Sequence, residues 1–303
     1  MRISSTQYHS TMNTALQLAN ERAGAVLQQM ATGNRLLKPS DDPIAQVRLM
    51  RLGREEAALD QYRKNIETLT SHLQQNEAYL DGIVNDTMQV RDLLVWALDG
   101  ANVPQDLNAM ATSIDSLRES ILYTANSRDQ EGRYVFSGTM TDMPAITYDP
   151  LQPLGSRYSF TGNVGQQLVT VGNGVTQPAN ISLPEAAPLL NLLDRVYATL
   201  STPSVNVNDP VMRAELTISL VGMDTALDSV NAQIARLGGR SNILQTLDDT
   251  HANVSLSNQN AAITIGQLDY GDAAVKLNGY TTAVQATQKA YAKVSNLSLF
   301  DVL

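Results

Sequence analysis

The 303-residue chain contains no cysteine, which excludes disulfides, thiolate zinc sites, iron–sulfur clusters and cysteine nucleophiles. It has only three histidines, His9, His72 and His251, and none has a metal-ligand residue three or four positions further on. We therefore expect no metal and no cofactor. No constellation of side chains supports catalysis, so we do not expect an enzyme.

Positive charge and long apolar runs are also scarce. The chain has 21 Lys and Arg against 30 Asp and Glu, a net charge of −9, whereas a protein that binds duplex DNA needs an excess of cations. We expect no nucleic acid partner. No stretch approaches about 20 apolar residues, so we expect no membrane insertion. The first residues lack the apolar core of a secretory signal, so any export is expected to use another route.

Aromatic residues are few, with three Phe and one Trp, which disfavours a β-sandwich or barrel and favours helices. Both flanks carry apolar residues at alternating spacings of three and four, the pattern of a coiled-coil seam. The first seam comprises Met12, Leu16, Ala19, Ala23, Val26 and Met30, and the last comprises Ala273, Leu277, Tyr280, Val284, Thr287, Tyr291 and Val294.

Two longer seams lie between the terminal ones. The first predicts a helix from about Pro43 to Leu98, about 80 Å long at about 1.5 Å per residue. Its seam residues are Leu59, Tyr62, Ile66, Leu69, Leu73, Asn76, Leu80, Ile83, Thr87, Val90, Leu94 and Ala97. The second predicts a return helix from Leu216 to Leu268, passing through Gly238 and Gly239. A helix as long as the first cannot fold around a compact core, so it needs an elongated partner.

The centre of the chain is rich in proline and glycine. It predicts strands at residues 133–137, 157–161 and 167–171, with hairpin turns at residues 162–163 and 172–174. The fold expected is mainly α, an elongated rod of long antiparallel coiled-coil helices formed by both terminal regions, with a small β-rich insert. The domains expected are 1–39 with 270–303, a terminal helix pair; 40–131 with 185–269, a helical rod; and 132–184, an outward β-rich insert.

Several stretches resemble the bacterial flagellin superfamily. They are the junction formed by Met30–Arg35 and Ser40–Ala45, the sequence QIARLG at residues 233–238, the break at Leu268–Tyr270, and the amphipathic end from Ala283 to Leu303. Two motifs are similar to the flagellar hook-associated protein 3 family within it. These are GRYVFSG at residues 132–138 and LSLF at residues 297–300.

This resemblance implies a structural adaptor at the hook–filament junction, exported through the flagellar type III apparatus to the extracellular flagellum. The partners implied are hook-associated protein 1, flagellin, copies of the chain in a helical or ring lattice, and an export chaperone at the C-terminal helix. The terminal pair is then the inner-tube assembly domain. Its expected assembly interface is the first and last seams from Met12 to Met30 and from Leu277 to Val294, together with Leu297, Leu299 and Phe300.

Two other functions remain open. A filament-forming flagellin would share the lattice helices but would polymerise by itself. A secreted coiled-coil adhesin or injectisome component need not carry the Ser40–Ala45 junction or the paired terminal seams. The two motifs at residues 132–138 and 297–300 favour the adaptor over a filament-forming flagellin.

Individual polar residues have structural interpretations. Ser40, Asp41, Asp42 and Pro43 form a helix-cap junction, in which Asp42 suits the N-cap and Pro43 the first helical position. An acid–base pair at Asp41 and Asp42 is the weaker alternative. His251, with Asn258 one heptad further on, suits a polar layer that fixes the register better than it suits a ligand or a pH switch.

Overall fold

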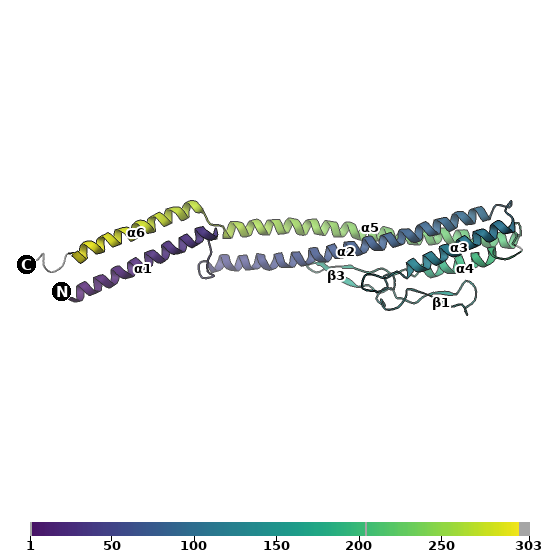
Figure 1. The fold of residues 1–303 in the computed structure, drawn as a ribbon, viewed down its shortest axis with the longest axis horizontal. Coiled ribbons are helices and arrows are strands. Elements are labelled where there is room, and N and C mark those ends of the chain that lie inside the picture. Colours follow the sequence, from purple (N-terminus) through teal and green to yellow (C-terminus); the bar gives the residue numbers. More distant parts are fainter. Residues whose placement is uncertain (1, 204, 297–303) are drawn as a thin grey trace, which may run out of the picture. The chain divides into compact units, whose positions relative to one another are not determined.

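The computed structural model describes residues 2–203 and 205–296. Among them are six α-helices and four short strands (Figure 1). In chain order they are α1 (Arg2–Thr32), α2 (Pro43–Ala97), α3 (Pro104–Ala125), β1 (Ile146–Tyr148), β2 (Tyr158–Phe160), β3 (Leu168–Gly172), β4 (Val175–Pro178), α4 (Ala186–Leu200), α5 (Pro210–Gly266) and α6 (Tyr270–Asn296). The predicted class, mainly α with a small β region, is confirmed.

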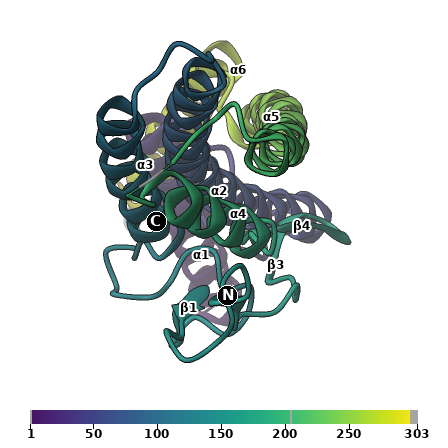
Figure 2. The same ribbon diagram turned by 90° about the vertical axis from the view of Figure 1, so that its right-hand side faces the viewer.

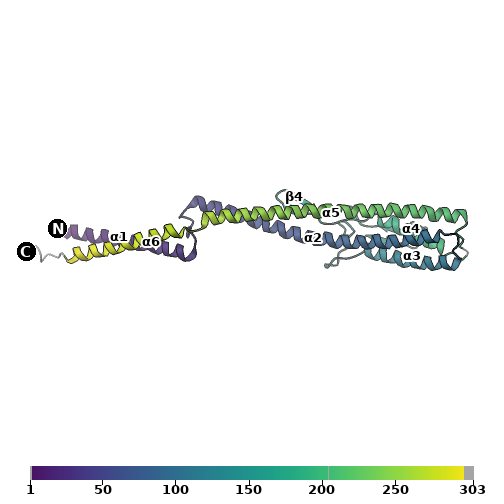
Figure 3. The same cartoon turned by 90° about the horizontal axis from the view of Figure 1, so that it is seen from above.

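The chain divides into two compact units. One contains residues 1–58 and 252–303, and the other contains residues 59–251, so α2 and α5 contribute to both. In the first unit, α1 and α6 lie side by side and run in opposite directions (Figures 1 and 3). The three-part domain division expected from the sequence stays a prediction.

The second unit is organised around the seam of α2. Every predicted seam residue from Ile66 to Ala97 is buried. These side chains join one apolar cluster with residues of α3, α4 and α5, and Figure 2 shows α3 and α4 beside α2 in an end-on view. The antiparallel pairing of α2 with α5 is marked at their surfaces by two ion pairs, Arg63–Asp248 and Arg91–Asp224.

The close approach of α4 to α5 depends on a glycine. A Cβ atom placed on Gly222 of α5 would clash with Cδ1 of Leu192 on α4. The small residue in the middle of a long helix is therefore explained by packing, since glycine lowers helix propensity by itself.

The strands form two separate antiparallel pairs, β1 with β2 and β3 with β4. The strands expected near residues 157–161 and 167–171 are present, but the strand expected at residues 133–137 is wrong. Its backbone groups bond to loops, since Tyr134 N–H donates to the Thr141 carbonyl and Val135 N–H donates to the Ser127 carbonyl. The sequence pattern did not predict β1 and β4, which pair with the predicted strands β2 and β3 and complete the two hairpins.

A buried charge cluster joins α3, α4 and β2. The Asp194 side chain on α4 is 2% exposed, and its carboxylate pairs with Arg118 Nη1 at 3.0 Å and with Arg157 Nη1 at 3.5 Å. Arg118 also pairs with Asp115, and its guanidinium lies over the rings of Tyr158 and Tyr197. One cation thus fixes the β1–β2 hairpin against two helices.

Replacing Asp194 by asparagine should lower the free energy of unfolding by about 3–5 kcal/mol, because it leaves buried cations with less opposite charge. Urea unfolding followed by circular dichroism measures the loss. The matched control is Asp224→Asn, which breaks the exposed pair with Arg91 and should cost less than about 1 kcal/mol. Equal losses in the two variants would contradict this account.

Candidate assembly surfaces and polar cavity

The two terminal seams face each other within one chain. Val26 packs with Leu268 and Ala273, and Met30, Leu277 and Tyr280 cover this cluster. Further along, the His9 ring lies edge-on to the Tyr291 ring at 5.3 Å. The remaining predicted seam residues of the described side chains are partly buried between the helices: Met12, Leu16, Ala19, Ala23, Val284 and Thr287.

The structure therefore uses the predicted interface residues to pair α1 with α6. Their contact with neighbouring subunits stays a prediction. Val294 lies in α6, and Leu297, Leu299 and Phe300 lie outside the described residues. Leu27 and Val275, which are 53% and 73% exposed, lie away from the seam, whereas the seam residue Tyr291 is 37% exposed.

Hydrogen bonds join the C-terminal end of α1 to the residues at the start of α6. Gly33, with a φ of 69°, ends α1 in the left-handed conformation, and its N–H donates to the Gln29 carbonyl. The Gly33 carbonyl then accepts from Leu268 N–H at 2.9 Å, and Arg35 N–H donates to the Gly266 carbonyl at 2.8 Å. Tyr270 Oη donates to the Met30 carbonyl at 3.2 Å. The sequence motif around Gly33 thus fixes the antiparallel register of α1 and α6.

The predicted cap junction stands at the start of α2. Asp42 Oδ1 accepts a hydrogen bond from Ala45 N–H at 3.0 Å, and Pro43 is the first helical residue. The pKa of Asp42 lies below its ordinary value because of this backbone bond and the Arg35 guanidinium, which pairs with Oδ2 at 3.2 Å. Asp41 instead accepts from Leu37 and Lys38 N–H, and Ser40 is exposed.

His251 joins the α5 seam to β3. Its Nε2 lies 2.8 Å from the Val171 carbonyl, and its ring is 5.6 Å from the Tyr62 ring. Four residues further along α5, Ser255 donates to Glu56 of α2, and Gln259 Nε2 donates to the same carboxylate oxygen at 3.0 Å. Along this part of α5, polar side chains make the contacts that apolar side chains make elsewhere in the seam.

The motif at residues 132–138 anchors the strand-containing segment. Phe136 is fully buried, and its ring lies 6.1 Å from that of Tyr79 on α2. Gly132 and Gly138 have φ values of 79° and 69°, which favour glycine. A Cβ atom on Gly138 would also clash with the Asn163 carbonyl oxygen. The backbone conformation therefore explains why glycine occupies both positions of the motif.

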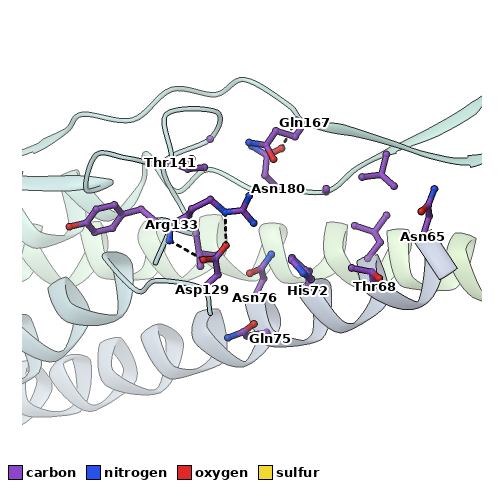
Figure 4. A pocket seen from close by; sticks show the side chains of 16 residues that line it. Asn65, Thr68, His72, Gln75, Asn76, Asp129, Arg133, Thr141, Gln167 and Asn180 are labelled. Carbon is purple, nitrogen blue, oxygen red and sulfur yellow. Dashed lines mark hydrogen bonds and ion pairs between the residues drawn. The ribbon is translucent and has the colours of Figure 1, made fainter. Parts of the chain in front are cut away.

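A cavity of about 300 Å³, lined by both polar and apolar side chains, lies between α2 and this segment (Figure 4). Its wall includes His72 and Asn76 of α2, the ion pair of Asp129 and Arg133, and Gln167 before β3. Burial raises the pKa of Asp129, but hydrogen bonds from Arg133 and Glu131 outweigh that effect and hold the pKa below its ordinary value. No pattern in the sequence indicated this cavity, because its residues come from three separate segments.

Residues 2–203 and 205–296 offer neither a site for a metal ion nor a helix that could span a membrane. No group of three or more His, Asp or Glu side chains is placed to hold a metal ion. No helix in this part of the chain has the length and apolar character needed to cross a bilayer.

The chain is similar to several flagellar proteins. Residues 3–141 match the family described as the bacterial flagellin N-terminal helical region. Flagellar hook-associated protein 3 of Escherichia coli strain K12 is 27% identical over 290 residues, which cover 91% of each chain.

Two solved structures are also similar. One from Vibrio parahaemolyticus, described as a flagellar hook-associated protein, is 32% identical with a TM-score of 0.67, and the match covers 74% of this chain and 99% of that one. A flagellar junction protein from Legionella pneumophila shares the fold, with a TM-score of 0.61 at 14% identity, over 72% of this chain and 100% of that one.

Long helices with paired terminal regions, together with these matches, define a structural subunit of the flagellin superfamily. Within that superfamily the chain belongs to the flagellar hook-associated protein 3 family. The family predicted from residues 132–138 and 297–300 is confirmed. Its members are structural components of the bacterial flagellum.

Replacing Asp42 by alanine should make the Ala45 amide exchange several-fold faster with solvent at neutral pH, because the N-cap acceptor is lost. Since the folded pKa is lowered, the cap contributes fully above the ordinary carboxyl pKa and is lost as the pH falls through the lowered value. Hydrogen exchange read by NMR measures both effects. The control Asp60→Ala removes an exposed acid of α2 and should leave Ala45 unchanged; unchanged exchange in Asp42→Ala would refute the cap.

Proposed function

We propose that this chain is the adaptor that joins hook-associated protein 1 to flagellin at the hook–filament junction. Copies of the chain would form a ring or helical lattice there, outside the cell, after export through the flagellar type III apparatus. The observation that supports this proposal is the antiparallel pairing of α1 with α6 through one continuous seam. A preformed helix pair presents the same outward surfaces on every copy.

The outward surfaces suit head-to-tail contacts. The seam residues pack between α1 and α6 of one chain, so they would hold the helix pair together. Exposed side chains such as Leu27 and Val275 would contact neighbouring subunits. Two different surfaces on one subunit form heterologous contacts, which extend into open assemblies when the rotation does not close. Under this proposal the terminal pair forms the inner tube, and the strand-containing segment projects outward.

Replacing Val284 by aspartate should abolish incorporation into the junction. The new carboxylate would lie in the seam opposite α1 without a partner, and the pair would separate. The assay mixes the chain with hook-associated protein 1 and flagellin and follows filament growth by light scattering and negative-stain microscopy. The matched control, Thr282→Asp, adds the same charge at an exposed position of α6. Circular dichroism should show that most helix survives in both variants.

The outcomes separate the candidate functions. Flagellin growth that needs the wild-type chain on top of hook-associated protein 1, with little growth of the chain alone, supports the adaptor. Long filaments of the chain alone would favour a flagellin, and no effect in any mixture would favour an adhesin or injectisome component. Normal filaments with Val284→Asp would overturn the role of the seam.

We also propose that the export chaperone binds the C-terminal helix. A truncated chain that ends at Tyr280 should lose chaperone binding in a pull-down, because most of α6 and everything after it are removed. The matched control lacks residues 2–24, an equal length from the other terminus, and should still bind. Chaperone binding that persists after the C-terminal truncation would disprove this contact.

A further inference from the structure

The cavity beside α2 contains a buried amide that the fold does not use. Asn76 is 5% exposed, lines the cavity and points from α2 toward the segment above it (Figure 4). Within the part of the chain that the structure describes, the Asn76 side chain forms no hydrogen bond. Its amide is not one of the fully enclosed polar groups that lack a partner, so it stays open to the cavity, where a ligand can reach it.

Other unpaired polar groups surround Asn76. The side chains of His72 and Gln167 line the same cavity at exposed positions, and neither has a hydrogen-bond partner among residues 2–203 and 205–296. By contrast, the amides of Asn65 and Asn180 are occupied, since Asn65 donates to the Thr170 carbonyl and Asn180 donates to the Gly165 carbonyl. The amides of Asn65 and Asn180 therefore hold the fold together, whereas the side chains of Asn76, His72 and Gln167 are available to a ligand.

The charges in the wall neutralise each other. Arg133 Nε pairs with Asp129 Oδ2 at 3.0 Å, and the Asp129 carboxylate also accepts the N–H groups of Arg133 and Glu131. An ionic ligand would find no uncompensated carboxylate or guanidinium in the wall. The cavity also has apolar walls, with Leu69, Val135 and Val169 beside the polar groups.

These features match one ligand chemistry. A sugar ring has hydroxyl groups that both donate and accept, as amides and imidazole require, and it has a C–H face that packs on apolar side chains. The cavity is at the lower end of the size range of small-molecule sites. We propose that it binds a neutral saccharide unit, with Asn76 and Gln167 as its main hydrogen-bonding residues. This proposal does not depend on assembly at the hook–filament junction.

The test is calorimetric titration of the full chain with glucose, galactose, N-acetylglucosamine and their neutral oligosaccharides. Replacing Asn76 by leucine removes the amide, keeps the volume and suits the α2 seam, so the variant should fold and bind at least tenfold more weakly. Gln167→Ala, at an exposed position, should also weaken binding. The control is Gln74→Ala; Gln74 is an exposed residue of α2 that does not line the cavity.

A second arm identifies the source of the sugar. A glycoprotein with neutral glycans is titrated beside its deglycosylated form and the free oligosaccharides. Tighter binding of the intact glycoprotein points to surface-attached glycans, whereas equal affinity per glycan points to free sugars. The proposal is overturned if no saccharide binds, if acidic sugars bind more tightly than neutral ones, or if Asn76→Leu and Gln167→Ala bind as well as the wild type.

Discussion

The alternation of apolar residues every three and four positions along α2 is the constraint on which the second unit depends. It places one continuous stripe of side chains, from Ile66 to Ala97, on a single helix face. A helix of 55 residues cannot bury that stripe against itself, so α3, α4 and α5 all pack along it. The cluster of Arg118 and Asp194 and the motif around Phe136 then attach the strand-containing segment to this helical core.

The same physical rule acts differently at the termini. There the seams are shorter and contain alanine and threonine beside the larger residues, so less apolar surface is buried. Hydrogen bonds around Gly33, Arg35 and Leu268 supplement this packing at the end where the helices join their unit. A structural subunit with a seam closed inside the chain has defined outer faces for assembly, which is consistent with the role proposed at the junction.

Polar residues in these seams have distinct uses. Thr87 donates to the Ile83 carbonyl of its own helix, and His251 reaches the backbone of β3, so both are satisfied inside the fold. Asn76 occupies an equivalent position but faces the cavity, where the described residues provide no hydrogen-bond partner. This difference separates a residue that secures packing from one available to a ligand, although the heptad pattern places all three at seam positions of their helices.

The sequence by itself determined the long helices, their inward faces and the start of α2 at Pro43. These features follow from local periodicity and capping, which neighbouring residues decide. It also determined the family, through the motif at residues 132–138. Only the tertiary structure decided the register in which the terminal seams pair, that residues 133–137 bond to loops, and where Asp194 and Asn76 lie. These depend on contacts between residues far apart in the chain, which periodicity along one segment does not specify.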